Sequence, residues 1–353
     1  MLKNNSEVVR IVGADVGFGT SIGVVLEYNP LTKKTLWLGK RIISSRARQG
    51  SNLTGDILNS LNNTYRVGNI DYTVDEKNNG EGVDDRKEYH FSAIQCVLMQ
   101  HLLQNLQLKN SDNLKIVSGM PISLFYATNN KRNDENIGRK QENLEKTVVT
   151  PLYNAEPIAI KNVSMLAEGV GAYLDFILND KGEFVSGSEE EVVSIIDIGD
   201  GTTDIVTLRD VTVVDFDRTA SQNIGVSDVK NEVRKILERD YNVTDETDFR
   251  INKMLYNRVY RVSGRDFSQD QIIAILTEAV SNVLVRLTAF VKKTLSRSSD
   301  IDRILVVGGG ATIYGPEIRA LFPQAVDIEE PQLANARGFA KLGLYNYKAE
   351  NDL

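Results

Sequence analysis

Two stretches of the chain share one pattern of hydrophobic and polar positions. Residues 8–28 and 192–210 each contain two apolar, β-rich runs joined by a short turn that carries glycine. Apolar runs on either side of such a turn are typical of a β-hairpin. One copy stands near the start of each half of the chain, which predicts a duplicated unit with a site between the two halves.

The same pattern predicts the elements between the hairpins. Apolar residues recur at helical spacing in three stretches, 91–106, 226–237 and 271–291. Short apolar runs predict strands at 114–118 and 303–307, and a closing helix is expected at 333–346. Residues 135–146 form a helical pattern that is polar nearly all round, so we expect a solvated helix. Residues 50–90 are polar and predict a loop-heavy subdomain with weak strands.

The length of the chain favours two domains. It has 353 residues, too many for one ordinary core. A polar break at 180–191 is the best candidate boundary. We therefore expect one domain in residues 1–180, to which the helix in 333–353 returns, and a second domain in residues 181–332.

Composition excludes several classes of protein. The net charge of −7 argues against direct binding to nucleic acid. A single cysteine, Cys96, excludes an internal disulfide and fits a reducing compartment, so we expect a cytoplasmic protein. With only two histidines, His90 and His101, a zinc site is not expected. No apolar run approaches the roughly 18 residues of a membrane span, so no membrane partner is expected.

The turn of the first hairpin has the composition of a phosphate-binding loop. Gly17 and Gly19 let backbone N–H groups approach an anion, and Phe18 and Thr20 complete the turn. Asp15 precedes them, and a carboxylate beside phosphates is repulsive unless a divalent cation lies between. Asp15 therefore predicts Mg²⁺, held through water.

The second hairpin repeats this arrangement. Asp197 takes the place of the leading aspartate and is expected to orient water bound to Mg²⁺. Three residues of the turn are expected to contact phosphate oxygens: Gly199, Gly201 and Thr202. Asp200 is placed to reach a ribose hydroxyl or a water. Two such turns after matching strands point to a ligand far more strongly than one.

A third glycine motif follows the last predicted strand. Gly308, Gly309 and Gly310 give an unobstructed backbone floor on which a flat base can lie. Tyr314 is placed to stack on such a base or to pack beside it.

The ordered set of two aspartate–glycine turns and a late triple glycine resembles the actin, sugar-kinase and heat-shock-chaperone superfamily. In that superfamily these stretches are two phosphate loops and an adenosine loop. Residues 165–172 resemble the helix that connects the domains, and residues 334–339 resemble the returning helix. The segment 114–146 and the run Gly225-Val226-Ser227 are similar to the ParM-like plasmid-segregation family of bacterial actins.

The resemblance implies an α/β actin-like fold of two duplicated, ribonuclease H-like domains with a nucleotide cleft between them. It implies an ATPase that uses ATP, with GTP as an alternative, and Mg²⁺, and that polymerises head to tail into filaments. Glu168 would align the attacking water, with Asp15 and Asp197 on the Mg²⁺ shell. Gly225 would contact phosphate or ribose, or simply begin a helix.

The resemblance also implies partners: other copies of the chain, and a DNA-binding adaptor protein on a plasmid centromere. One position departs from many relatives, which carry a lysine seven residues after the first aspartate, where this chain has Ile22. The phosphate charge is then expected to be balanced by Mg²⁺, by backbone dipoles, or by a Lys or Arg from elsewhere. The alternative function is a small-molecule kinase of the same fold.

Overall fold

Two β-sheets, one of five strands and one of six, form the framework of the protein. The computed structural model describes residues 8–50, 63–75, 86–152, 155–209 and 213–351. The first sheet has the order β3-β2-β1-β7-β9. Its strands are β1 (Val9–Val16), β2 (Thr20–Asn29), β3 (Lys34–Ser44), β7 (Leu114–Met120) and β9 (Ser164–Ala167).

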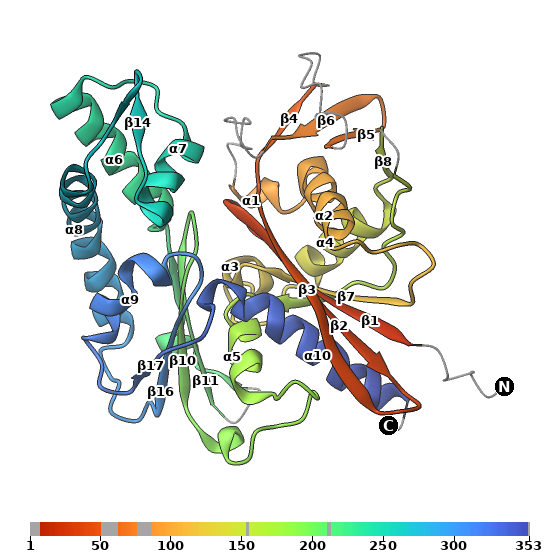
Figure 1. Ribbon diagram of the computed structural model, residues 1–353. Helices are drawn as coiled ribbons and strands as arrows, with labels where there is room; N and C mark the ends of the chain where they lie inside the picture. The colour runs from red at the N-terminus through yellow and green to blue at the C-terminus, as the bar shows by residue number, and fades with distance from the viewer. Residues whose placement is uncertain (1–7, 51–62, 76–85, 153–154, 210–212, 352–353) are drawn as a thin grey trace.

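The second sheet repeats this topology. Its main path has the order β12-β11-β10-β16-β17, and β13 (Ala220–Gln222) pairs with β11. The other strands are β10 (Val193–Ile198), β11 (Thr203–Arg209), β12 (Val213–Val214), β16 (Arg303–Val307) and β17 (Ala325–Val326). In both sheets the first two strands of the unit are antiparallel and the next two along the path are parallel. The two hairpins and the duplicated unit are therefore confirmed, as Figure 1 shows.

The two hairpins agree in register as well as in order. Asp15 pairs with Ile22 and Asp197 pairs with Asp204, so each leading aspartate occupies the same place relative to its turn. The ladders end at Val16–Ser21 and at Ile198–Thr203, which leaves four residues in each turn. Equivalent turns at the ends of equivalent strands are brought to the same side of their sheets.

Helices cover both faces of the first sheet. Alternate residues of β1 point to opposite faces: Val12, Ala14 and Val16 pack with α2 (Ala93–Asn105), while Val9 and Ile11 pack with α10 (Ala334–Glu350). The C-terminal helix therefore returns to the first sheet, as expected. The boundary between residues 180 and 181 stays a prediction.

Glycines allow α10 to lie unusually close to its neighbours. A Cβ atom at Gly13 would stand 1.8 Å from the carbonyl oxygen of Ala336. A Cβ atom at Gly338 would stand 1.7 Å from the carbonyl oxygen of Gly171 in α5 (Val170–Ile177). Both distances are far below any van der Waals contact, so these backbones can approach only because no side chain lies between them.

The second half has its own core, formed by the second sheet and three helices. These are α6 (Val226–Tyr241), α8 (Gln269–Thr294) and α9 (Ala311–Arg319). α8 is the one helix in the described part of the chain that is long and apolar enough to cross a membrane. A core helix passes the same test, and residues of α8 such as Ile272, Val283 and Leu287 are buried in this core.

Short elements complete the second half. After α6 come α7 (Asp248–Asn252), the π-helical turn η3 (Lys253–Asn257) and the hairpin of β14 (Arg261–Val262) and β15 (Arg265–Asp266). Three 3₁₀ turns are η1 (Ser188–Glu190), η2 (Phe216–Arg218) and η4 (Pro331–Leu333).

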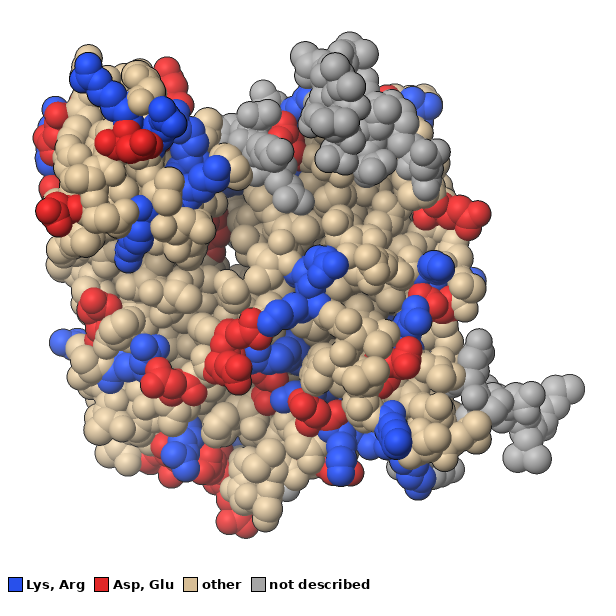
Figure 2. Space-filling model, viewed as in Figure 1, with Lys and Arg blue, Asp and Glu red and all other residues tan. Residues whose placement is uncertain are grey.

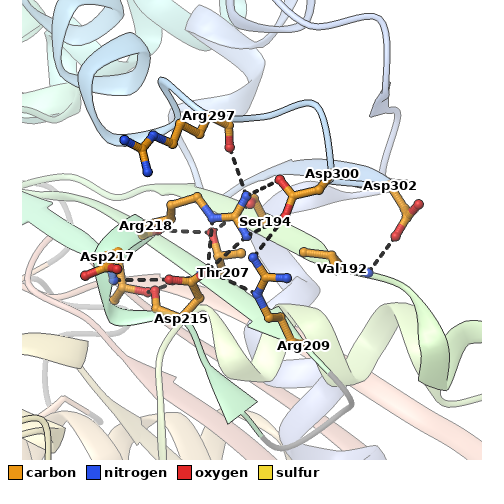
Figure 3. A network of polar contacts seen from close by, with 11 residues as sticks. Val192, Ser194, Thr207, Arg209, Asp215, Asp217, Arg218, Arg297, Asp300 and Asp302 are labelled. Atoms are coloured by element: carbon orange, nitrogen blue, oxygen red, sulfur yellow. Dashed lines mark hydrogen bonds and ion pairs between the residues drawn. The ribbon is translucent and has the colours of Figure 1, made fainter.

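A polar network fixes η2 to the loop before β16. Figure 3 shows the guanidinium groups of Arg209 and Arg218 converging on the carboxylates of Asp215 and Asp300. The side chain of Arg218 is only 8% exposed, so its charge depends on these partners. The ring of Phe216 in the same turn lies 5.2 Å from the ring of Tyr126 in the first half. The network therefore holds one of the contacts between the two halves.

The polar region near the start of the chain contains a small sheet of order β4-β6-β5-β8. Its strands are β4 (Ala47–Gln49), β5 (Thr64–Val67), β6 (Ile70–Val74) and β8 (Val149–Pro151). The weak strands expected in 50–90 are thus confirmed, while residues 51–62 and 76–85 lie outside the described residues. Short helices α1 (Arg86–Tyr89) and α3 (Ile122–Phe125) flank longer elements of this half.

The charged helix α4 (Asp134–Lys146) corrects one expectation. It is a helix, as predicted, but it is not solvated on every side, because Ile137, Lys140 and Leu144 are buried. Leu144 packs in the same core as residues of α2, and Ile137 packs in the core that contains residues of α3. The same face of α4 carries Lys140 into the interior of the first half.

Charges of both signs are interspersed over the face of the molecule drawn in Figure 2. Such a mixture, with a net charge of −7, differs from the one-sided basic surface of a nucleic-acid-binding protein.

Candidate functional site

The two glycine turns face each other across a pocket of about 220 Å³, here called the turn pocket. A Cβ atom at Gly19 would lie 2.2 Å from the Cβ atom of Asp200, so the first turn touches the second directly. Most of the residues singled out in the sequence line this one pocket: Asp15, Gly17, Phe18, Gly19, Thr20, Glu168, Asp197, Gly199, Asp200, Gly201, Thr202 and Gly309.

Side chains of the first half hold the first turn in shape. The N–H of Gly17 donates to the carbonyl oxygen of Thr20 at 3.0 Å, which closes the turn. The Tyr89 hydroxyl donates to the carbonyl oxygen of Gly17 at 2.8 Å, and the Gln95 side-chain amide donates to that of Val16 at 2.7 Å. With these carbonyl groups satisfied from behind, the turn keeps its opposite edge toward the pocket.

The second turn is fixed by the start of α6. The N–H of Gly199 donates to the carbonyl oxygen of Thr202 at 2.9 Å, the equivalent of the bond in the first turn. The N–H of Ser227, at the start of α6, donates to the carbonyl oxygen of Asp200 at 2.8 Å. A Cβ atom at Gly225 would stand 2.4 Å from that same oxygen, so only glycine allows this approach.

Three predicted residues do not line the turn pocket. Gly225 packs against the second turn as described, and a Cβ atom at Gly310 would lie 2.3 Å from Cγ2 of Ile198. Tyr314 is fully buried in the core of the second half, and its hydroxyl donates to the carbonyl oxygen of Gly225 at 3.4 Å. Its ring therefore supports the wall behind the pocket and does not face the cleft.

The pKa values of the two leading aspartates, Asp15 and Asp197, are both raised. Burial raises the pKa of Asp15 to about 6, although the charge of Lys140 and a hydrogen bond from Asn335 lower it. Burial and the charge of Asp15 raise the pKa of Asp197 to about 7, again against a hydrogen bond from Asn335. Both carboxylates are thus costly to ionise where they stand.

Glu168 stands at the junction of β9 and α5, beside these aspartates. Its N–H donates to the carbonyl oxygen of Met120 at 2.9 Å, which fixes its backbone. Its Oε1 atom is buried and has no hydrogen-bond partner among the described residues. Burial, and then the charge of Asp15, raise the pKa of Glu168 well above its usual range. An unpartnered acceptor that lines a pocket is suited to bind a water there.

Lys140 supplies a buried positive charge that the sequence did not reveal. It comes from α4, is 0% exposed, and its Nζ atom donates to the carbonyl oxygen of Gly119 at 2.6 Å. Burial lowers the pKa of Lys140 to about 8, while the charges of Glu168 and Asp15 oppose that shift. Ile22, where many relatives carry lysine, lines the turn pocket with an apolar side chain. The positive charge near the pocket is therefore supplied by α4 and not by β2, the strand that contains Ile22.

The carboxylates fit a divalent cation. Asp15, Asp197, Glu168 and Asp204 all line the turn pocket, and the pKa of each is raised chiefly by burial. One cation among them would relieve this crowding of like charges. Among residues 8–351 as described, no three His, Cys, Asp or Glu side chains are grouped to hold an ion directly. Binding through water is the mode these carboxylates suit.

A neighbouring pocket of about 390 Å³ adjoins the first one and shares Thr20, Asp200 and Gly309 with it. It reaches the second half at α6 and α7. There the Nζ atom of Lys230 lies 2.6 Å from Asp200 Oδ1 and 3.1 Å from Asp248 Oδ2. Asp200, expected to reach a ribose hydroxyl or a water, is therefore paired with a buried lysine while it lines both pockets.

The sequence missed three residues of the site: Lys140, Lys230 and Asn335. Lys140 and Lys230 lie on helices whose polar residues look like solvated positions. Asn335 stands in the stretch of small residues that marks the returning helix, where it gave no signal of its own. An asparagine among small apolar residues is a signal that could have indicated a buried side chain with a hydrogen-bond partner.

The side chains of both histidines, His90 and His101, are buried. The Nδ1 atom of His101 lies 2.8 Å from the Tyr65 hydroxyl. Burial lowers the pKa of His90, which lines the turn pocket beside Lys140, well below its usual range.

Comparisons with known proteins agree with this geometry. A family model described as plasmid segregation protein ParM, N-terminal, matches residues 48–177. A second, described as plasmid segregation protein ParM, C-terminal, matches residues 188–342. Together they cover most of the chain. No curated protein matches the sequence.

Solved structures show the fold. The archaeal actin homolog Ta0583 in complex with ADP is 21% identical, with a TM-score of 0.70 over 94% of this chain and 97% of that one. The apo pSK41 ParM protein is 20% identical, with a TM-score of 0.66 over 98% and 99%. A 15-stranded ParM filament from Clostridium botulinum is 18% identical, with a TM-score of 0.65 over 95% and 99%. These similarities make the fold actin-like.

Proposed function

The chain belongs to the ParM family of plasmid-segregation proteins, and on that premise we propose that it is a cytoplasmic ATPase whose filaments move plasmid DNA. ATP and Mg²⁺ bind in the turn pocket, hydrolysis drives filament turnover, and an adaptor protein joins the filament to the DNA. The observation that carries the proposal is that two equivalent turns, each led by an aspartate that lines the pocket, meet in one pocket between two equivalent sheets.

The backbone N–H groups of the two turns bind the phosphates in this proposal. Asp15 and Asp197 would hold Mg²⁺ through water, and the ion would supply positive charge to the phosphate oxygens. Lys140 adds a second positive charge from α4 and keeps Asp15 and Glu168 from facing each other uncompensated. Lys140 thus supplies the positive charge that many relatives supply from a lysine at the position of Ile22.

Glu168 orients the attacking water through its unpartnered Oε1 atom. Its rigid backbone, fixed to Met120 at one end of β9, keeps this acceptor in place. Positioning of this kind lowers the barrier without covalent chemistry, as is usual in phosphoryl transfer.

The family, and the filament in the solved ParM structure, support self-association. The bound γ-phosphate touches both turns and holds the halves closed, so its loss loosens filament contacts. A net charge of −7 favours an adaptor as the DNA-binding partner.

The proposal is tested by adding ATP and Mg²⁺ to the purified protein and following phosphate release, light scattering and negative-stain images together. We expect filaments that form on ATP addition and disassemble as phosphate appears. Asp197→Ala should remain folded and lose most of the turnover, and Glu168→Ala should assemble filaments that persist. ATP turnover that depends on an added acceptor, without filaments, would favour the kinase instead.

The adaptor is tested separately, by a gel-shift titration against the centromere-like DNA of the plasmid that encodes the chain. We expect no shift with the protein alone, with or without ATP. Tight and sequence-specific binding by the chain itself would refute the adaptor model.

A further inference from the structure

Asn335 occupies the centre of the site and uses its whole hydrogen-bonding capacity there. It lies in the first turn of α10 and is 6% exposed. Its side-chain oxygen accepts from the N–H groups of Gly169 at 2.9 Å and Ala172 at 3.1 Å. Its amide nitrogen donates to Asp197 Oδ2 at 2.7 Å and to Asp15 Oδ2 at 3.4 Å. An amide side chain has two donors and two acceptor positions, and all four are used.

The oxygen side of this amide fixes the backbone that carries Glu168. Gly169, the residue before α5, has no side chain with which to cap the helix. Its φ of +79° and the side chain of Val206, 2.9 Å from where a Cβ would lie, both require glycine. Asn335 therefore caps α5 from a different helix, directly after Glu168.

The nitrogen side joins the two halves. Asp15 is the penultimate residue of β1 in the first sheet and Asp197 that of β10 in the second, yet one amide group donates to both. One side chain therefore bridges the two carboxylates. A relative movement of the sheets would have to break at least one of the two bonds.

We propose that Asn335 is a positioning residue that sets Asp15, Asp197 and Glu168 in one arrangement and so makes the Mg²⁺ site complete only when the two halves are closed. This inference rests on the proposed function. The competing view is that Asn335 merely caps α5.

Two substitutions separate these views. Asn335→Asp keeps an oxygen that accepts from Gly169 and Ala172, since aspartate caps helices as well as asparagine does. It removes both donors and faces Asp15 and Asp197 with a third carboxylate. Asn335→Ala removes the cap and the donors without adding charge. Asn346→Asp is the matched control, because it makes the same substitution on the same helix at a residue that lines neither pocket.

The experiment measures the affinity of the full chain for fluorescently labelled ATP by anisotropy, in EDTA and in a Mg²⁺ titration. Thermal unfolding without nucleotide and steady-state kcat and KM are measured beside it. We expect Asn335→Asp to unfold at a lower temperature than the wild type, because a third carboxylate is buried beside two others, but to stay folded at the assay temperature and to bind ATP in EDTA within about twofold of the wild type. Its Mg²⁺-dependent gain in affinity and its kcat should each fall by about tenfold or more, as when the partners of metal ligands are removed. Asn346→Asp should match the wild type in all of these.

An Asn335→Asp protein that keeps the wild-type Mg²⁺-dependent gain and kcat, or exceeds them, would overturn the inference and leave a cap only. If that variant does not fold, Asn335→Ala, assayed below its unfolding temperature, decides the matter by the same two measurements. A wild-type chain without Mg²⁺-dependent ATP binding would overturn the proposed function and the inference together. If the wild type shows Mg²⁺-dependent ATP binding and Asn335→Asp shows the same gain and kcat, the inference fails and the proposed function stands.

Discussion

Nη2 of Arg46 lies 2.7 Å from Oδ2 of Asp248, and this ion pair joins the first half to the second beside the turn pocket. Arg46 follows β3, and Asp248 begins α7. Both side chains are less than a fifth exposed. Lys230 and Arg234 bind the same carboxylate, so three cations from the two halves meet at one anion.

Removing the pair should loosen the closed arrangement. A half-buried pair of this kind contributes about 1 kcal/mol, so Arg46→Ala should raise the population of the open form, and with it the rate of nucleotide exchange, about fivefold. The measurement is the release of a fluorescent ATP analogue after mixing with excess ATP. Arg239→Ala is the control, because Arg239 pairs with Asp240 and Glu278 within the second half alone. Equal exchange rates in both variants would rule out this role for the pair.

This contact should persist over the whole neutral range of pH. Burial raises the pKa of Asp248, but Lys230, Arg234 and Arg46 outweigh it and hold that pKa well below the usual range. A carboxylate whose pKa is depressed by folding contributes stability above its unfolded pKa of about 3.9 and loses it only as the pH falls further. The exchange rate of the wild type should therefore not change through loss of this pair between about pH 5 and 9.

Lys140 tests how the site balances its charge. Lys140→Met keeps the aliphatic volume but leaves Asp15 and Glu168 without the buried ammonium. ATP turnover should fall by about a hundredfold, the usual cost of losing one preorganised charge partner. Lys146→Met on the same helix is the control, since Lys146 is exposed and pairs only with Glu142 among its described contacts. Normal turnover in Lys140→Met would show that the backbone and Mg²⁺ suffice.

The aspartates of the turns predict a pH dependence of the opposite sign to that of Asp248. Folding raises the pKa of Asp15 to about 6 and that of Asp197 to about 7, chiefly by burial. The folded chain then binds more protons than the unfolded chain, so stability from these groups is present below about pH 4 and is lost as the pH rises through about 6 to 7.

Thermal unfolding of the nucleotide-free protein between pH 5 and 8 measures this effect. Asp197→Asn removes one of the two groups, so its unfolding temperature should fall less than that of the wild type across this range. Parallel curves for the two proteins would mean that Asp197 ionises normally. Bound Mg²⁺ and ATP favour the ionised carboxylates, so the fall should shrink when both are present.

The close approach of α10 to α5 gives a prediction on stability. Gly338→Ala places a Cβ atom where a carbonyl oxygen of Gly171 lies, and the backbones would have to separate. We expect a loss of about 3 kcal/mol in the free energy of unfolding, at the upper end for overpacking. Gly138→Ala is the matched control, because nothing lies within 4 Å of a Cβ there, and it should gain about 0.5–1 kcal/mol. Chemical denaturation of both variants measures the difference, and equal stabilities would contradict the packing argument.

Much of the fold could be predicted because it depends on local pattern. The hairpins at 8–28 and 192–210, the strand at 303–307 and the helices at 91–106 and 271–291 agree with β1–β2, β10–β11, β16, α2 and α8. The two turns could be predicted because each carries glycine between two apolar runs. Both features depend on only a few consecutive residues.

What could not be predicted depends on contacts between distant segments. Lys140 looks like one of many charges on a polar helix, and only the packing of Ile137 and Leu144 turns it inward. Asn335 meets Asp15 across 320 residues of sequence. Tyr314 follows a glycine floor that suits a base, but the fold turns its ring into the core.

The return of α10 to the first sheet has a consequence for how the protein is made. Val9, Ile11 and Leu26 are covered by Ala336, Ala340 and Leu344, so one face of the earliest strands has no cover until the last helix has left the ribosome. During synthesis that apolar face stays open while the whole second half emerges and folds. A ribosome that stalls before residue 334 would release a chain with a complete second core and an unfinished first one, a product prone to aggregate and to need a chaperone.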